Sequence, residues 1–213
     1  MKTLFQCDFD GTITQEDISF LILDAFASGD WRQLLAQYRE GKISVGRFNT
    51  EAFAMVKADE PTLLQFVKSR AKIRAGFHQL LDYCHRQGLK FVIVSNGLDF
   101  YIETILRDIG IDNIEVFAAR TRFSPSGIDV RYVGPRGNQL MDSFKESYVS
   151  LFRDRGYRVI YAGNGISDVS PSRQAYHIFA TGELLAHCKQ TNLNCTPFVD
   201  LHDIVEGLES LRL

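Results

Sequence analysis

The chain has 213 residues, of which 45% are hydrophobic and 23% are charged, as in an ordinary globular protein with one good core. Its formal net charge of −2 gives no general positive field, so we expect neither nucleic acid nor a membrane surface as a partner. Asp8 and Asp10 interrupt the apolar N-terminal run, and ISFLILDAFA is too short to span a bilayer. We therefore expect a cytoplasmic protein.

The cysteines and histidines do not follow the spacings of known metal sites. The four cysteines include no Cys-x-x-Cys pair, and the five histidines include no His-Glu-x-x-His. In a reducing compartment, free thiols are favoured over disulfides. A metal site built from cysteine or histidine is therefore not expected.

The first strand is predicted over residues 3–9 (TLFQCDF), an apolar run that ends in acids. From residue 18 to residue 72 the apolar side chains recur at helical spacing, and no segment has a convincing strand pattern. Pro61 stands where the first turn of a helix would begin. We expect a helical insertion over residues 15–72, between the first strand and the rest of the chain.

After the insertion, helical and strand patterns alternate. Helices are expected over residues 77–84, 100–109 and 144–152. Apolar strands are expected at 90–95, 114–119, 157–162 and 177–181, with a hairpin over 121–133. This alternation predicts an α/β protein with a Rossmann-like parallel sheet covered by helices on both faces. The catalytic core would comprise residues 1–14 and 73–213, and residues 15–72 would form a small helical cap.

Ligands bind to such sheets beyond the carboxyl ends of the strands, so the loops that follow strands are the expected site. The segment DFDGT places Asp8 and Asp10 at the end of the first strand, and Gly11 lets the chain leave the sheet there. Two buried carboxylates would be costly, and a divalent cation would relieve their repulsion. Oxygen ligands of this kind suit Mg²⁺. The alternative is a loop with two solvated acids.

Two further segments offer groups for an anion. Ser95, Asn96 and Gly97 follow the second strand and provide a hydroxyl and turn N–H groups. Lys145, near the start of a predicted helix, would let a phosphate approach a carboxylate. The alternatives are an ordinary turn and a surface lysine.

The segment GNGISD follows the strand at 157–162. Asp168 replaces the third glycine of the dinucleotide fingerprint, which disfavours a dinucleotide cofactor. The alternative to a functional role for Asp168 is an ordinary helix N-cap. Asn164 lies between the two glycines of this loop. Each of these motifs follows a strand or leads into a helix, so together they predict one site at the rim of the sheet.

Together, DFDGT (8–12), SNG (95–97), Lys145 and GNGISD (163–168) resemble the motifs of the haloacid dehalogenase (HAD) superfamily of phosphohydrolases. The helical insertion resembles the C1-type cap of its phosphoserine phosphatase-like branch. Within that branch, DFDGTIT and the stretch FATGELLAHCKQTNLNCTPFVDLHDI are most similar to the methionine-salvage phosphatases. Those enzymes act on 2-hydroxy-3-keto-5-methylthiopentenyl-1-phosphate.

This resemblance implies a role for each matching residue in phosphoryl transfer. Asp8 would be the nucleophile that forms an aspartyl-phosphate. Asp10 would protonate the leaving oxygen and then deprotonate the hydrolytic water. Ser95, the amides of Asn96–Gly97, and Lys145 would bind the phosphate oxygens.

The resemblance also implies a metal site and a contact between cap and substrate. Mg²⁺ would bind the Asp8 carboxylate, the main-chain carbonyl of Asp10 and the loop that carries Asn164 and Asp168. Asp17, at the start of the first cap helix, matches an acid that meets the substrate in relatives.

One position departs from the pattern of the family. Relatives usually carry an aspartate where this chain has Asn164, so the site loses one negative charge and metal affinity should fall. We expect an Mg²⁺-dependent phosphatase for a small phosphorylated metabolite. The alternatives are a phosphatase for phosphoserine or another small phosphomonoester, and a regulatory or binding protein with a weakened metal site. The sequence leaves the oligomeric state open.

Overall fold

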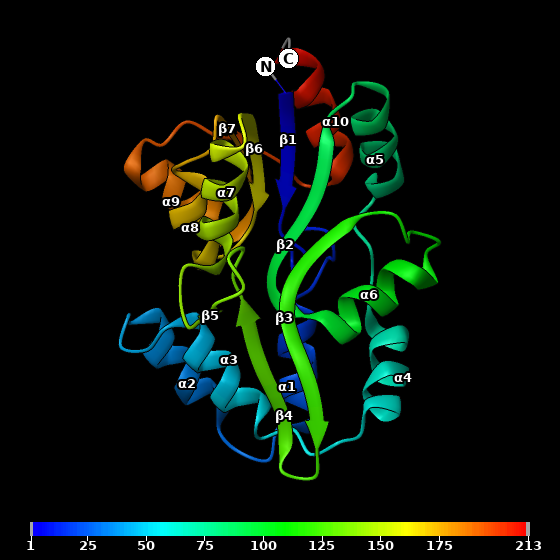
Figure 1. Cartoon of the computed structure of the whole chain (residues 1–213), viewed down its shortest axis with the longest axis vertical. Helices are drawn as coiled ribbons and strands as arrows, with labels where there is room; N and C mark the ends of the chain where they lie inside the picture. The colour runs from blue at the N-terminus through cyan, green and yellow to red at the C-terminus, as the bar shows by residue number, and fades with distance from the viewer. Residues whose placement is uncertain (1, 212–213) are drawn as a thin grey trace.

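β1 lies at the centre of an eight-stranded sheet in the computed structural model, which describes residues 2–211 (Figure 1). The strands run in the order β5-β4-β3-β2-β1-β6-β7-β8. Their bounds are β1 Lys2–Cys7, β2 Lys90–Leu98, β3 Glu115–Ser124, β4 Gly127–Val133, β5 Gln139–Leu140, β6 Tyr157–Gly163, β7 His177–Ala180 and β8 Thr196–Pro197. The six neighbouring strands β3-β2-β1-β6-β7-β8 pair in parallel. β4 and β5 add antiparallel pairs at the β3 edge of this sheet.

Helices cover both faces of this sheet. α5, α6 and α10 lie on one side and α7, α8 and α9 on the other (Figure 1). Their bounds are α5 Phe77–Arg86, α6 Asp99–Asp108, α7 Phe144–Asp154, α8 Val169–Ser172, α9 Gly182–Thr191 and α10 Leu201–Ser210. The predicted α/β fold is confirmed, with a sheet that is mostly rather than wholly parallel.

The order of the strands places the ends of β1, β2 and β6 together. β1 is buried along its apolar length, with Leu4, Phe5 and Cys7 fully covered. The chain passes from β1 to β2 and β3 on one side, and β6, β7 and β8 extend the sheet on the other. The strand order therefore reverses at β1, which is where sheets of this class leave a crevice for a ligand.

The predicted helical insertion consists of α1 Ile18–Phe26, α2 Trp31–Arg39, α3 Val45–Phe53 and α4 Glu60–Arg70. An aspartate or serine caps each helix by accepting a hydrogen bond from the N–H three residues on; the caps are Asp17, Asp30, Ser44 and Asp59. The two ends of the insertion lie side by side where they join the core. Gln15 N donates to Lys72 O at 2.8 Å, and Thr14 forms an isolated β-bridge with Ile73. These contacts favour the predicted boundaries at 15–72.

The hairpin of β3 and β4 reaches beyond the core and runs along the insertion (Figure 1). Ile128, Val130 and Tyr132 on β4 are buried, and β4 packs against α3. The hairpin predicted at 121–133 is confirmed, and its first strand continues the one expected at 114–119. It therefore ties the insertion to the core.

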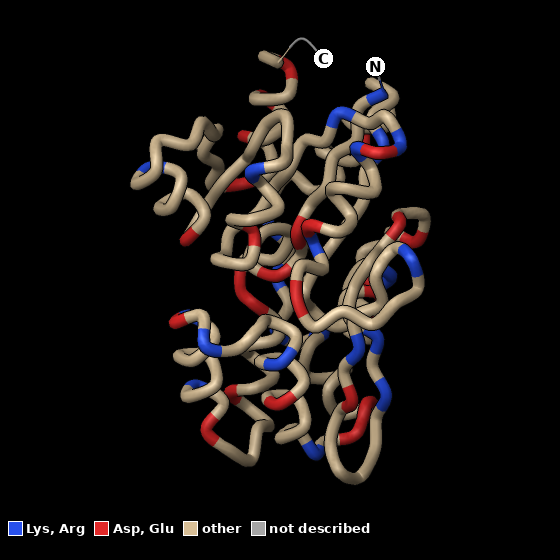
Figure 2. Tube along the Cα trace, turned by 60° about the vertical axis from the view of Figure 1, so that its left-hand side comes forward, with Lys and Arg blue, Asp and Glu red and all other residues tan. Residues whose placement is uncertain are grey.

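Acidic and basic residues are interspersed along the trace (Figure 2). All four cysteines are free thiols. Within residues 2–211, no helix has the length and apolar character needed to cross a membrane.

Candidate functional site

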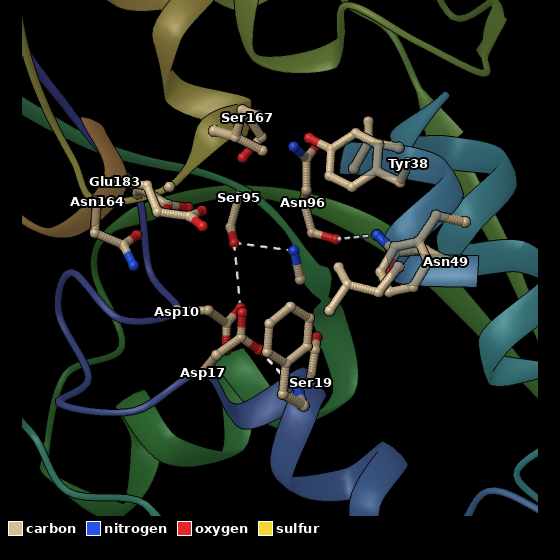
Figure 3. Close-up of a pocket in the computed structure, with 18 of the residues that line it drawn as sticks. Asp10, Asp17, Ser19, Tyr38, Asn49, Ser95, Asn96, Asn164, Ser167 and Glu183 are labelled. Atoms are coloured by element: carbon tan, nitrogen blue, oxygen red, sulfur yellow. Dashed lines mark hydrogen bonds between the residues drawn. The ribbon is translucent and has the colours of Figure 1, made fainter. Parts of the chain in front are cut away.

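A cavity of about 380 Å³ lies between the ends of β1, β2 and β6 and the helices of the insertion (Figure 3). Its wall includes eight of the nine residues singled out from the sequence: Asp8, Asp10, Asp17, Ser95, Asn96, Gly97, Lys145 and Asn164. The ninth, Asp168, is fully buried and does not line the cavity. The structure therefore gathers residues that are up to 156 positions apart, from Asp8 to Asn164, around one space.

Lys145 bridges two carboxylates beneath this cavity. Its Nζ lies 2.7 Å from Asp8 Oδ1 and 2.7 Å from Asp168 Oδ1, and the side chain is 2% exposed. Burial alone would lower the pKa of Lys145, but the charges of Asp168 and Asp8 outweigh it and raise the pKa. Burial, and next the charge of Asp168, raise the pKa of Asp8 to about 7. Lys145 is thus a permanent cation fixed against the candidate nucleophile.

Asp168 uses both of its oxygens within the protein. Oδ1 accepts from Lys145 Nζ and, at 2.6 Å, from the hydroxyl of Tyr161, while Oδ2 accepts from the N–H groups of Asn164 and Gly165 at 3.0 and 2.9 Å. A carboxylate has about four lone-pair positions, and four donors occupy those of Asp168. This geometry favours Asp168 as the residue that positions Lys145 and the loop, rather than as a direct metal ligand.

Gly163 makes room for the Asp168 carboxyl group. A Cβ atom at Gly163 would stand 2.5 Å from Cγ and 2.7 Å from Oδ2 of Asp168, closer than real contacts allow. The same carboxyl accepts the N–H groups that follow, so it folds the GNGISD loop onto itself. The first glycine of the loop is therefore required by packing against Asp168.

Asp10 is held by donors from three different elements. Oδ1 accepts from Ile18 N at 3.0 Å, at the first turn of α1. Oδ2 accepts from the hydroxyl of Tyr101 at 2.6 Å and from Ser95 Oγ at 3.5 Å. Burial, and next the charge of Asp17, raise the pKa of Asp10 to about 7. Burial also raises the pKa of the Tyr101 hydroxyl, so that hydroxyl keeps its proton.

The Ser95–Gly97 turn is oriented by the insertion and the hairpin. The carbonyl of Asn96 accepts from Asn49 Nδ2 at 3.1 Å (Figure 3). It also accepts from the Tyr132 hydroxyl at 2.6 Å. In a trans peptide the next N–H points the opposite way. That N–H belongs to Gly97 and donates to Ser95 Oγ at 3.0 Å. The turn therefore presents its hydroxyl and N–H together on the cavity side.

Asp17 combines a structural contact with a place in the cavity wall. Its Oδ1 accepts from Phe20 N at 2.9 Å as the N-cap of α1. Burial, with the charge of Asp8, raises the pKa of Asp17 to about 6 against the opposing hydrogen bond from Phe20. The carboxyl group faces the same space as Asp8 and Asp10.

The oxygen atoms near Asp8 fit a divalent cation. Burial, and next the charge of a neighbouring aspartate, raise the pKa of both Asp8 and Asp10, so a cation there would stabilise their charged forms. Asn164 adds an amide oxygen, which accepts from the Thr12 hydroxyl at 3.1 Å. Within residues 2–211, no three or more His, Cys, Asp or Glu residues are grouped to hold a metal ion, so this set depends on a neutral amide. A set of oxygens from the Asp8 carboxylate, the Asp10 main-chain carbonyl and the Asn164 amide would match the preference of Mg²⁺.

Replacing Asn164 with Asp should lower the Mg²⁺ concentration for half-saturation by about 10-fold, because an added charge near the ion is worth ~1 kcal/mol or more even when well screened. Mg²⁺ titrations followed by both thermal unfolding and turnover would measure this shift. Asn164→Ala should move the same constant in the opposite direction. Identical constants for all three proteins would place Asn164 outside the metal shell.

Several polar residues in or around the site were not foreseen from the sequence, among them Thr12, Asn49, Tyr101, Tyr132 and Tyr161. The tyrosines count as apolar in a periodicity analysis, and each is almost fully buried. The available signal was that a buried tyrosine hydroxyl needs a polar partner. Which partner it finds depends on contacts between distant elements.

Comparison with known proteins agrees with this geometry. Residues 5–171 match the family model of the haloacid dehalogenase-like hydrolases. A Bacillus mycoides protein named 2-hydroxy-3-keto-5-methylthiopentenyl-1-phosphate phosphatase is 27% identical over 209 residues, covering 96% of this chain and 95% of that protein. A Bacillus thuringiensis protein of the same name is 26% identical with the same coverage.

Solved structures share the fold. A substrate-bound phosphoserine phosphatase superimposes with a TM-score of 0.73 at 18% identity, covering 97% of this chain and 98% of that one. A phosphoserine phosphohydrolase-like protein from Francisella tularensis gives a TM-score of 0.69 at 19% identity, with both chains fully covered. Since the family model spans more than half of its length, the chain belongs to the haloacid dehalogenase-like hydrolases, with a phosphoserine phosphatase-like fold.

Proposed function

We propose that the chain hydrolyses its substrate through an aspartyl-phosphate formed on Asp8. It is a phosphoric monoester hydrolase of the haloacid dehalogenase type, and its substrate is a small phosphorylated metabolite. The observation that carries the proposal is the position of Asp8. Lys145 holds Oδ1, while Oδ2 accepts no hydrogen bond from residues 2–211 and Asp8 lines the cavity. One oxygen is anchored and the other is available for attack.

In the proposed reaction, Asp8 Oδ2 attacks phosphorus and the bond from phosphorus to the leaving oxygen breaks. Asp10 gives that oxygen a proton, and later takes a proton from the water that attacks the aspartyl-phosphate. Ser95 and Lys145 bind the phosphate oxygens, and the N–H of Gly97, which donates to Ser95 Oγ, orients that hydroxyl. The products are the dephosphorylated metabolite and inorganic phosphate.

We assign Mg²⁺ as the cofactor. Asp8, the main-chain carbonyl of Asp10 and Asn164 would hold it, and Asp168 would support this loop from beneath. The ion would supply positive charge that offsets the repulsion between the phosphate and the acids.

The helical insertion would act as a cap over this site. Its side of the cavity is formed mainly by the apolar or aromatic side chains of Phe20, Leu35, Tyr38, Val45 and Phe48. Such a surface would exclude bulk water from the reacting groups and would accept an apolar tail on the substrate.

The lining of the cavity favours 2-hydroxy-3-keto-5-methylthiopentenyl-1-phosphate over phosphoserine. The carboxylate of phosphoserine would need a cation, and the cavity wall has two. Lys145 already pairs with Asp8 and Asp168, and Arg39 pairs with Glu183 at 2.9 Å. A methylthio group needs only the apolar wall. The Bacillus relatives that match the chain over nearly its full length carry the name of this substrate.

The test is a panel of phosphorylated metabolites assayed for phosphate release with Mg²⁺ and with EDTA. We expect Mg²⁺-dependent turnover, with kcat/KM for the methylthio substrate at least ~100-fold above that for phosphoserine, roughly the cost of a carboxylate left without its partner. The reverse order would overturn the substrate assignment. Absence of turnover across the panel and on p-nitrophenyl phosphate would favour the alternative, a binding protein with a weakened metal site.

A further inference from the structure

Among the hydrogen-bond donors to the carboxyl group of Asp10 within residues 2–211, the hydroxyl of Tyr101 lies closest. It donates to Asp10 Oδ2 at 2.6 Å, and the side chain is fully buried. Ser19 Oγ lies 2.8 Å from the same hydroxyl. Because the single proton of Tyr101 goes to the carboxylate, Ser19 must donate to Tyr101. The three residues therefore form one directed chain from Ser19 through Tyr101 to Asp10.

This chain and the N–H of Ile18 together fix the carboxyl group of Asp10 from both sides. Oδ1 is bound by Ile18 N and Oδ2 by Tyr101, so rotation about the Cβ–Cγ bond would break both hydrogen bonds. Ile18 and Ser19 belong to the first turn of α1, and Tyr101 belongs to α6 of the core. Two of the groups that set the orientation of Asp10, the N–H of Ile18 and the hydroxyl of Ser19, are thus supplied by the insertion.

The sequence leaves room for this arrangement at Gly97. A Cβ atom at Gly97 would stand 2.2 Å from both Asp10 Oδ2 and the hydroxyl oxygen of Tyr101. Any larger residue would push the two groups apart. The glycine of the Ser95–Gly97 turn therefore serves the Tyr101–Asp10 contact as well as the turn itself.

We propose that Tyr101, supported by Ser19, is the positioning residue that aims the Asp10 carboxyl group at the leaving oxygen. This inference rests on the proposed function. In the step concerned, the bond from phosphorus to the leaving oxygen breaks while the proton of the Asp10 carboxyl group passes to that oxygen. The hydroxyl of Tyr101 gives no proton away. It keeps the carboxyl group from turning out of line, which matters most when the leaving group is strongly basic.

The experiment compares substituted phenyl phosphates of nearly equal size, from p-nitrophenyl phosphate to phenyl phosphate, with Mg²⁺ present. A nitrophenolate leaves without a proton, whereas an unsubstituted phenolate benefits from one. In Tyr101→Phe, kcat/KM should fall about 10-fold or more for phenyl phosphate and less than about 3-fold for p-nitrophenyl phosphate. The plot of log kcat/KM against leaving-group pKa should therefore become steeper. Asp10→Asn should steepen this plot more than Tyr101→Phe does.

Two further variants complete the test. Tyr148→Phe removes a hydroxyl that donates to Val133 O at 3.2 Å, away from the cavity, and should leave the slope unchanged. Ser19→Ala should steepen the slope less than Tyr101→Phe does. It replaces Tyr101→Phe as the test variant if Tyr101→Phe does not fold. An unchanged slope, or an equal loss on all the phosphates, would overturn the role of Tyr101. Absence of turnover by the unmodified protein would instead overturn the proposed function.

Discussion

Replacing Asp8 with Asn should abolish Mg²⁺-dependent phosphate release, with kcat reduced by about 10⁴-fold or more, because Asp8 has one carboxylate oxygen held by Lys145 and lines the cavity with the other left for attack. The fold should survive this change. Burial raises the pKa of Asp8 to about 7, so its charged form opposes folding above the ordinary carboxyl pKa. Removing the charge at pH 8 should therefore not lower the melting temperature of the metal-free protein.

Phosphate release and thermal unfolding, measured on the same preparations, check both parts. Asp82→Asn, a change on α5 outside the cavity, is the matched control and should alter neither quantity. Substantial turnover by a folded Asp8→Asn protein would contradict the assignment of the nucleophile.

Replacing Lys145 with Met should destabilise the protein by about 3–5 kcal/mol and reduce kcat at least ~100-fold. The buried carboxylates of Asp8 and Asp168 would lose their shared cation, and removal of one partner from a buried ion pair is strongly unfavourable. The loss of activity follows because a phosphate and a carboxylate nucleophile repel one another without that charge.

A double substitution separates the two effects. Asp168→Asn combined with Lys145→Met removes one uncompensated charge, so it should recover part of the stability and none of the activity. Lys68→Met, which breaks an exposed pair with Asp108, should change the free energy of unfolding by less than ~1 kcal/mol. Urea unfolding with parallel assays measures all three. A Lys145→Met protein with an unchanged free energy of unfolding would show that the ion pairs of Lys145 with Asp8 and Asp168 do not stabilise the site.

The sequence predicted the sheet and the positions of the motifs because both depend on local patterns. Apolar runs that end in DFDGT, SNG and GNGISD specify strands that end at one rim, and the parallel sheet then brings Asp8, Ser95 and Asn164 together. Lys145 required the resemblance to a known family, since an isolated lysine carries no pattern. Its side chain in fact proved to be 2% exposed.

The sequence could not predict which partners the polar side chains choose. Asp168 stands at a position matched to a metal loop, yet its four hydrogen bonds come from Lys145, Tyr161 and two main-chain N–H groups. Tyr101 lies on an apolar helix face, and only the packing of α6 against β2 and β3 brings it to Asp10. Such contacts depend on three elements meeting at once, which no local pattern records.

The structure also clarifies the effect of having an amide, rather than a carboxylate, at Asn164. The amide oxygen is still in the cavity wall, beside Thr12, so the position keeps an oxygen while losing a charge. Because Asp8 and Asp10 already have raised pKa values, a third carboxylate there would further destabilise the metal-free site. As the proposed metal ligand, Asn164 would reduce repulsion in the absence of Mg²⁺ at the expense of affinity for the ion.

The central claim is that Asp8 carries the phosphoryl group during turnover, and trapping the intermediate tests it most directly. The protein would be mixed with substrate and Mg²⁺, quenched in acid within the first turnover, digested and analysed by mass spectrometry. We expect a single phosphorylated peptide, containing residues 8–12 and modified at Asp8, that is absent from Asp8→Asn. Phosphate attached at any other residue, in a protein that releases phosphate, would contradict the account.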